Sequence, residues 1–195
     1  NVWEDAEHKP LINEEREYRI YMSSEKARTI DISVTFTAAY GDVKWGDTKE
    51  GGIVAVRMRP ELSGKYGTIT NALGDQKEAN LWGKPAPWCD YSGNIEGVGQ
   101  VGLTVFDNPK NFRFPACWHV RMYGLMGANY FGYSYFSEKK YNEGLIPKNG
   151  DYQMKSGETL PFTHRVYVHA GDVNTAKVAD RYADYTTPPK AEWIQ

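Results

Sequence analysis

The stretch of sequence that decides the fold is Ala27–Ala39, ARTIDISVTFTAA. Apolar and polar side chains alternate along it, and the apolar set is Ile30, Ile32, Val34, Phe36 and Ala38. Because successive side chains of a strand point to opposite faces, this alternation predicts a strand with one buried face. A second long strand is predicted at Glu15–Met22, and residues 23–26 form the turn between the two.

The rest of the chain continues this β pattern. Further strands are predicted at Val43–Trp45, Ile53–Met58, Gly97–Asp107, Phe114–Met122 and Phe162–His169. Residues 60–87 are rich in turn formers and predict a long loop or hairpin excursion. One helix is predicted from Val173 to Tyr185, capped by Asp172 or Asn174 and ended by Pro188-Pro189. We therefore expect an all-β antiparallel sandwich with one short C-terminal helix, as a single domain over residues 1–195.

Composition narrows the classes of partner. The 195 residues carry 23 Lys and Arg against 25 Asp and Glu, a net charge of -2, and the cations are scattered among acids. Nucleic acid is therefore not an expected partner. No apolar run reaches the length of a membrane-spanning helix, so a membrane is not an expected partner either. The chain begins at Asn1 without a Met or a charged-then-apolar leader, and we expect a processed or trimmed chain.

No cofactor motif is present. The sequence has no P-loop, no dinucleotide fingerprint and no Gly-x-Ser-x-Gly. Cys89 and Cys117 lack CxxC spacing, which argues against structural zinc and leaves a disulfide and two buried thiols as alternatives. A metal held by His119, Glu50 and one of the later histidines lacks a recognisable spacing, and we predict no metal. If their strand is regular, His164 and His169 point to opposite faces, since their separation is odd.

The segments 118–125, WHVRMYGL, and 128–132, ANYFG, concentrate aromatic rings and hydrogen-bonding groups. On a strand, His119 and Arg121 share one face, which we expect to be wet, while Trp118 and Val120 point into the core. Rings stack on the C–H faces of sugars while polar groups meet hydroxyls or a carboxylate. We therefore predict that Arg121, Tyr123 and Asn129 bind a carbohydrate ligand. The alternative is that these aromatic residues belong to the core of the sandwich.

Two further motifs supply carboxylates. GDTKEGG, residues 46–52, places Glu50 beside Lys49 at the entry to a buried strand, although an exposed turn is the alternative. In WCDY, residues 88–91, Asp90 is flanked by Trp88 and Tyr91, a setting that suits a proton donor. We predict that Glu50, Asp90 and His119 are catalytic and converge on one concave face with Arg121. In the same site, the predicted ligand-binding set also includes Lys49, Trp88 and Tyr91.

Four segments carry a resemblance to a known family: GDTKEGG (46–52), APWCDYSG (86–93), FDNPKNFRFPACWHVRMYGLMGANYFG (106–132) and HRVYVHAGD (164–172). They resemble the bacterial PmoA family over residues 14–182. The family's label comes from a membrane-embedded methane monooxygenase subunit, whereas this chain shows no membrane span and no evident copper site. The resemblance implies a galactose-mutarotase-like supersandwich.

The resemblance also bears on context. Members tend to occur beside sugar-degrading genes, which suits a periplasmic or secreted location in a bacterium. They are usually longer, with a further N-terminal portion, so we expect this chain to be the C-terminal two thirds of a longer protein. Met122 departs from the family pattern, because relatives often carry a polar residue there.

Two functions follow from these motifs. The first is a carbohydrate-active protein of polysaccharide or glycoside catabolism that acts by acid/base chemistry, whether as hydrolase, lyase or epimerase. The second is a non-catalytic sugar-binding or accessory module. A structural domain and a metal-dependent oxygenase are the remaining alternatives. An enzyme should enclose Glu50, His119 and a second carboxylate in one pocket, whereas a binding module should show a shallow aromatic strip.

Overall fold

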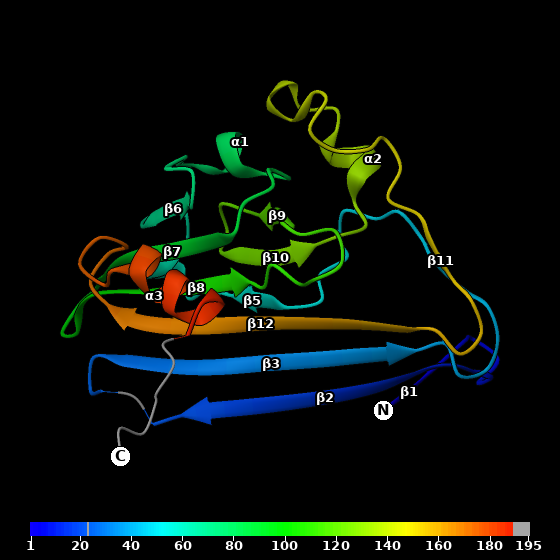
Figure 1. Ribbon diagram of the computed structural model, residues 1–195. Coiled ribbons are helices and arrows are strands. Elements are labelled where there is room, and N and C mark those ends of the chain that lie inside the picture. Colours follow the sequence, from blue (N-terminus) through cyan, green and yellow to red (C-terminus); the bar gives the residue numbers. More distant parts are fainter. Residues whose placement is uncertain (23, 189–195) are drawn as a thin grey trace, which may run out of the picture.

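The structure is a computed structural model that describes residues 1–22 and 24–188. A seven-stranded antiparallel sheet forms one layer (Figure 1). Its order is β1 (Val2–Glu4), β2 (Pro10–Tyr21), β3 (Ala27–Thr37), β12 (Thr159–Ala170), β8 (Gly99–Asp107), β7 (Trp88–Ile95) and β6 (Thr68–Asn71). The predicted hairpin at the start of the chain is present as β2 and β3, and Ser23 of its turn lies outside the described residues.

Two smaller antiparallel sheets and several short helices complete the fold. The three-stranded sheet has the order β5 (Ala55–Arg57), β10 (Leu125–Asn129) and β9 (Cys117–Val120), and β4 (Val43–Trp45) pairs with β11 (Tyr152–Met154). The helices are η1 (Pro60–Leu62), α1 (Glu78–Leu81), α2 (Tyr133–Phe136), η2 (Lys140–Asn142) and α3 (Val178–Thr186). Figure 1 shows α1 and α2 beyond the three-stranded sheet, on the side away from β12 and β3. The predicted all-β antiparallel, sandwich-like fold with one short C-terminal helix is confirmed.

The main core lies between the seven-stranded and three-stranded sheets. The large sheet contributes Val34, Phe36, Tyr91, Val105 and Phe162, and the small sheet contributes Trp118, Val120, Met126 and Ala128. Trp118 is 1% exposed, and its indole N–H donates to the carbonyl of Ala86 at 2.7 Å. The prediction that Trp118 and Val120 point into the core is therefore confirmed.

Helix α3 covers part of the other face of the large sheet. Its Val178 packs on Trp88, Phe106 and Tyr167 in a second apolar cluster. The helix begins five residues after the predicted Val173, because the Asp172 carboxylate accepts the N–H groups of residues 174 and 175 and closes a separate turn first. Figure 1 shows α3 lying across β7 and β8.

The histidines of β12 and the two cysteines are all buried. His164 packs on Tyr130 toward the main core, whereas His169 stacks on Tyr167 on the opposite face, as their odd spacing predicts. Both cysteines are free thiols, which decides between the two alternatives. Cys89 lies in the main core and Cys117 packs with residues of α2, and burial raises the pKa of each thiol.

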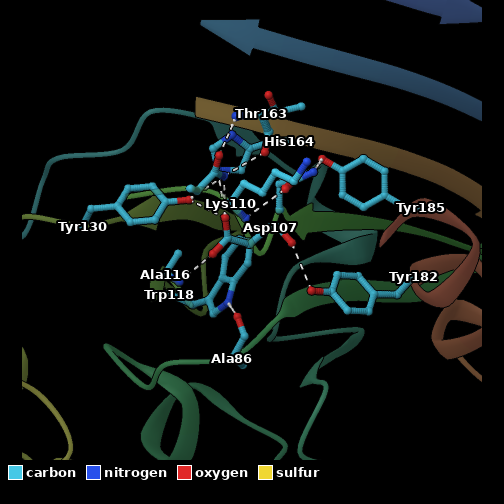
Figure 2. A network of polar contacts seen from close by, with 12 residues as sticks. Ala86, Asp107, Lys110, Ala116, Trp118, Tyr130, Thr163, His164, Tyr182 and Tyr185 are labelled. Atoms are coloured by element: carbon cyan, nitrogen blue, oxygen red, sulfur yellow. Dashed lines mark hydrogen bonds and ion pairs between the residues drawn. The ribbon is translucent and has the colours of Figure 1, made fainter. Parts of the chain in front are cut away.

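A buried polar network ties the sheets together at Asp107, the last residue of β8 (Figure 2). The Asp107 carboxylate accepts the Tyr130 hydroxyl at 2.6 Å, the Asn111 amide at 2.7 Å and the Ala116 N–H at 2.7 Å. Burial raises the pKa of Asp107 to about 6 in spite of these three donors, and it lowers the pKa of His164 to about 3. Since the Tyr130 hydroxyl donates to Asp107, it accepts from Nε2 of His164, 2.7 Å away.

Removing one hydroxyl from this network should destabilise the whole protein. Tyr130→Phe deprives the buried Asp107 carboxylate of a donor and leaves Nε2 of His164 without its partner. We expect a loss of about 2 kcal/mol in the free energy of unfolding, measured by urea denaturation. Tyr133→Phe is the matched control, since the hydroxyl of this buried ring has no hydrogen bond among the described residues. Equal losses in the two variants would contradict the assigned role of the network.

Candidate functional site

The outer face of the three-stranded sheet has a floor of small residues beside His119. Across the sheet, His119 of β9 faces Gly127 of β10, which in turn faces Ala55 of β5. A Cβ built on Gly52 would lie 3.6 Å from both the Cβ of Ala55 and the Cα of Gly127. Gly52 and Ala55 are exposed, whereas Gly127, which lies between Ala55 and His119 in the sheet, is buried.

His119 itself is enclosed by aromatic rings. The Trp82 ring lies 6.0 Å from the imidazole and 4.9 Å from the Phe136 ring of α2. These rings leave His119 only 3% exposed, so the prediction of a wet face is wrong for this residue. The indole N–H of Trp82 donates to Nδ1 of His119 at 3.1 Å. Because indole can only donate, Nδ1 is an acceptor and the neutral ring carries its proton on Nε2.

Glu50 lies on the loop that Asn129 holds against the sheet. The buried Asn129 amide donates to the carbonyls of Thr48 and Lys49, at 2.9 and 3.0 Å, and its oxygen accepts the N–H groups of residues 131 and 132. The Asn129 side chain therefore bonds only to the main chain, and its role is to position Glu50 rather than to contact a ligand. The Glu50 carboxylate is 3.9 Å from Nε2 of His119 and 3.9 Å from Nζ of Lys49.

Arg121 is held by a second carboxylate. Its Nε forms an ion pair with Glu78 at 3.1 Å, and the other oxygen of Glu78 accepts the N–H of Met122. Tyr91 reaches this turn from the large sheet, and its buried hydroxyl bonds the main chain of Arg121. Tyr91 thus supports the site from the core, with a pKa raised by burial, and does not line it. The exposed ring of Tyr123 lies 5.6 Å from the Arg121 guanidinium.

The structure does not bring Asp90 and Trp88 to this site. Even-numbered residues at the start of β7 point to the face of the large sheet that α3 covers, whereas Tyr91 points into the main core. Asp90 is fully buried and accepts the Thr104 hydroxyl at 2.7 Å, and its carboxylate lies 3.0 Å from Nε2 of His169. Trp88 packs beside α3. Glu50 and Arg121 therefore lie near His119, whereas the prediction that Asp90 joins them is wrong.

Sequence reasoning missed Glu78 and Trp82, which lie in the segment read as a loop excursion. They are four residues apart, a spacing that puts both on one side of a helical turn, and α1 supplies that turn. Gly83 makes this packing possible. It has φ +73°, and a Cβ there would lie 2.3 Å from the Phe136 ring.

The charges around His119 act in opposite directions on its pKa. Burial lowers the pKa of His119 most strongly, Arg121 and Lys49 lower it further, and the carboxylates of Glu50 and Glu78 raise it. The net direction is downward, which agrees with the indole donor at Nδ1.

Within residues 1–22 and 24–188, no three His, Cys, Asp or Glu side chains are grouped to hold a metal. In the same part of the chain, no helix has the length and apolar character of a membrane span.

Comparison with known proteins gives one match. A family model described as "Family of unknown function (DUF6807)" covers residues 1–183. No curated protein and no solved structure matches the chain.

Titration of His119 tests the electrostatics of this site. We expect its imidazole to titrate below 6.5 in an NMR experiment that follows the ring signals with pH. Glu50→Gln should lower the midpoint further, because it removes a charge that favours the imidazolium. Lys49→Gln is the opposite control and should raise it. A shift of the same sign in both variants would contradict the described arrangement of charges.

Proposed function

The chain belongs to the DUF6807 family, whose function is unknown, and we propose that it acts on a carbohydrate by acid/base chemistry at the outer face of the three-stranded sheet. One observation carries the proposal. The Glu50 carboxylate lies beside the Nε2–H of a neutral His119, above a floor formed by Gly52, Ala55 and Gly127. Lys49 and Arg121 lie near this pair, and each lies beside an exposed tyrosine ring. The resemblance to PmoA-family proteins, with its setting beside sugar degradation, is part of the same proposal.

The two groups have complementary roles toward a sugar hydroxyl. The 3.9 Å between them leaves room for a hydroxyl that donates to Glu50 and accepts from Nε2–H of His119. Glu50 is then the general base that removes a proton. His119 stabilises the charge that develops on the oxygen, because its neutral ring keeps its proton and donates a hydrogen bond. Trp82 fixes the tautomer that this role needs.

Binding groups lie around the pair. The rings of Tyr123 and Tyr135 are 52% and 42% exposed and offer faces on which a sugar can stack. Lys49 lies 6.0 Å from the Tyr135 ring, next to Glu50. Nε of Arg121 pairs with Glu78, and the other nitrogens of the guanidinium, beside Tyr123, can donate to hydroxyls or a carboxylate.

A non-catalytic sugar-binding module is the second candidate. The observation that favours it is the exposure of Glu50, whose side chain is 65% accessible on an open face. An exposed carboxylate can accept sugar hydroxyls without any chemistry. The two functions differ in one measurable respect, since a binding module retains its ligand unchanged.

Substitution of the central pair tests the proposed function. A panel of plant and algal oligosaccharides is incubated with the protein, and products are detected by mass spectrometry. With a substrate found in this way, Glu50→Gln and His119→Gln should each lower kcat by a factor of about 100 or more. Glu50→Gln should leave the melting temperature unchanged, whereas His119→Gln should also lower it, because the Trp82 indole N–H loses its acceptor. Ala55→Leu should raise KM, because its new side chain occupies the floor beside His119.

Glu96→Gln is the matched control. It removes an exposed carboxylate at the turn between β7 and β8, away from the three-stranded sheet, and should leave turnover unchanged. Full turnover in both Glu50→Gln and His119→Gln would refute the proposal. Tight binding of an oligosaccharide that is recovered intact would favour the binding module instead.

A further inference from the structure

A groove of about 630 Å³ adjoins the candidate site at the end of the three-stranded sheet. It lies between the end of β5, the segment that contains η1, and the turn from β9 to β10. Its lining residues are Arg57, Met58, Pro60, Ser63, Lys65, Met122 and Tyr123. We call it the Arg57 groove. Its volume is within the usual range for a site that binds a small molecule.

The cations of the Arg57 groove have no acidic partner. The side chains of Arg57 and Lys65 form no ion pair among the described residues, and the lining contains no carboxylate. Their neighbour Arg59 differs, because Nε and Nη2 of its guanidinium donate to the two carboxylate oxygens of Glu61. In a protein with a net charge of -2, this groove is locally positive. Such a surface attracts an anion.

A third cation lies on the other side of Met122. A smaller cavity of about 230 Å³ shares Met122 with the Arg57 groove and is lined by Gln76 and Lys77 among others. Lys77 likewise forms no ion pair within the described part of the chain. Because Met122 is 40% exposed and separates the two hollows, the apolar side chain is flanked by Arg57, Lys65 and Lys77.

Tyr123 connects the Arg57 groove with Arg121, which is two residues from His119. The Tyr123 ring lies between two guanidinium groups, 4.8 Å from that of Arg57 and 5.6 Å from that of Arg121. Arg121, the first residue after β9, follows His119 by two residues. A ligand of more than one unit can therefore extend from the floor beside His119, across Tyr123, into the groove.

We propose that the Arg57 groove is a subsite for an acidic sugar unit, one that carries a carboxylate or a sulfate. The proposal rests on the proposed function and narrows its substrate class to anionic oligosaccharides. Met58 and the Tyr123 ring contact the C–H faces of the unit, while Arg57 and Lys65 pair with its anionic group. A neutral sugar leaves these two cations without an anionic partner and gains less from binding here.

Binding of matched acidic and neutral trimers tests the subsite. Isothermal titration calorimetry compares trigalacturonate and sulfated galactotriose with galactotriose, and trimannuronate with mannotriose. We expect at least one acidic trimer to bind at least tenfold more tightly than its neutral counterpart, with an affinity that falls as salt is added. The acidic trimer that binds identifies the anion as a carboxylate or a sulfate.

Variants locate the effect. Arg57→Gln and Lys65→Gln should each weaken binding of that acidic trimer about tenfold and leave the neutral trimer unaffected. Arg59→Gln is the matched control, because this guanidinium is already paired with Glu61 and lies outside the groove lining, and it should change nothing. Equal loss in Arg59→Gln and Arg57→Gln would overturn the assignment to the groove.

Failure of the subsite and failure of the proposed function give different results. If neutral trimers bind as tightly as acidic ones and His119→Gln abolishes their turnover, the subsite is overturned and the proposed function stands. If an acidic trimer binds in the way that Arg57 predicts but is recovered intact by the wild-type protein, the acid/base function is overturned and the subsite stands. If no trimer binds, the subsite is overturned, and the products from the oligosaccharide panel decide the proposed function.

Discussion

Both sheets of the sandwich converge on the buried carboxylate of Asp107. Burying such a group costs several kcal/mol unless donors surround it, so the chain segments that supply those donors are held tightly. One donor is the N–H of Ala116, just before β9, and another is the hydroxyl of Tyr130, just after β10. The carboxylate therefore fixes both ends of the β9–β10 hairpin, which carries His119 and Arg121.

Residues next to Asp107's donors fix the surface segments of the site by hydrogen bonds to the main chain. Asn129 precedes Tyr130 and holds the carbonyls of the loop that ends at Glu50. Tyr91 does the same for Arg121 from the large sheet. The charged groups of Glu50 and Arg121 are thus accessible to solvent, while hydrogen bonds from buried side chains hold the main chain that carries them. A site that must keep a carboxylate and an imidazole a few ångströms apart needs supports of this kind.

The alternation of apolar and polar residues predicted the strands that have one solvent-facing side. Odd or even spacing along a strand predicted which side each residue occupies. This reasoning was right for Ala27–Ala39, for Trp118 and for the two histidines of β12. It missed β7, most of which is buried on both faces and therefore shows no alternation. The sequence analysis selected Asp90 as the second carboxylate because of its aromatic neighbours. On β7, however, Asp90 points to the same face as Trp88, which α3 covers. Glu78 begins a helix of four residues and Trp82 directly follows it, and such a helix is too short for a periodic signal.

The charges along the site nearly cancel, and this bears on how a bound ligand changes the interaction between Glu50 and His119. Arg121 is neutralised by Glu78, and Lys49 lies near Glu50, so the floor beside His119 has little net charge of its own. Glu50 is mostly solvated, and water screens its interaction with the imidazole. Under the proposed function, a sugar bound beside Glu50 would displace that water and strengthen the interaction between Glu50 and His119. The cations of the Arg57 groove have no carboxylate of the described chain to oppose them. In the subsite that we propose, an acidic sugar unit would supply the opposite charge and hold the neighbouring unit beside Glu50 and His119.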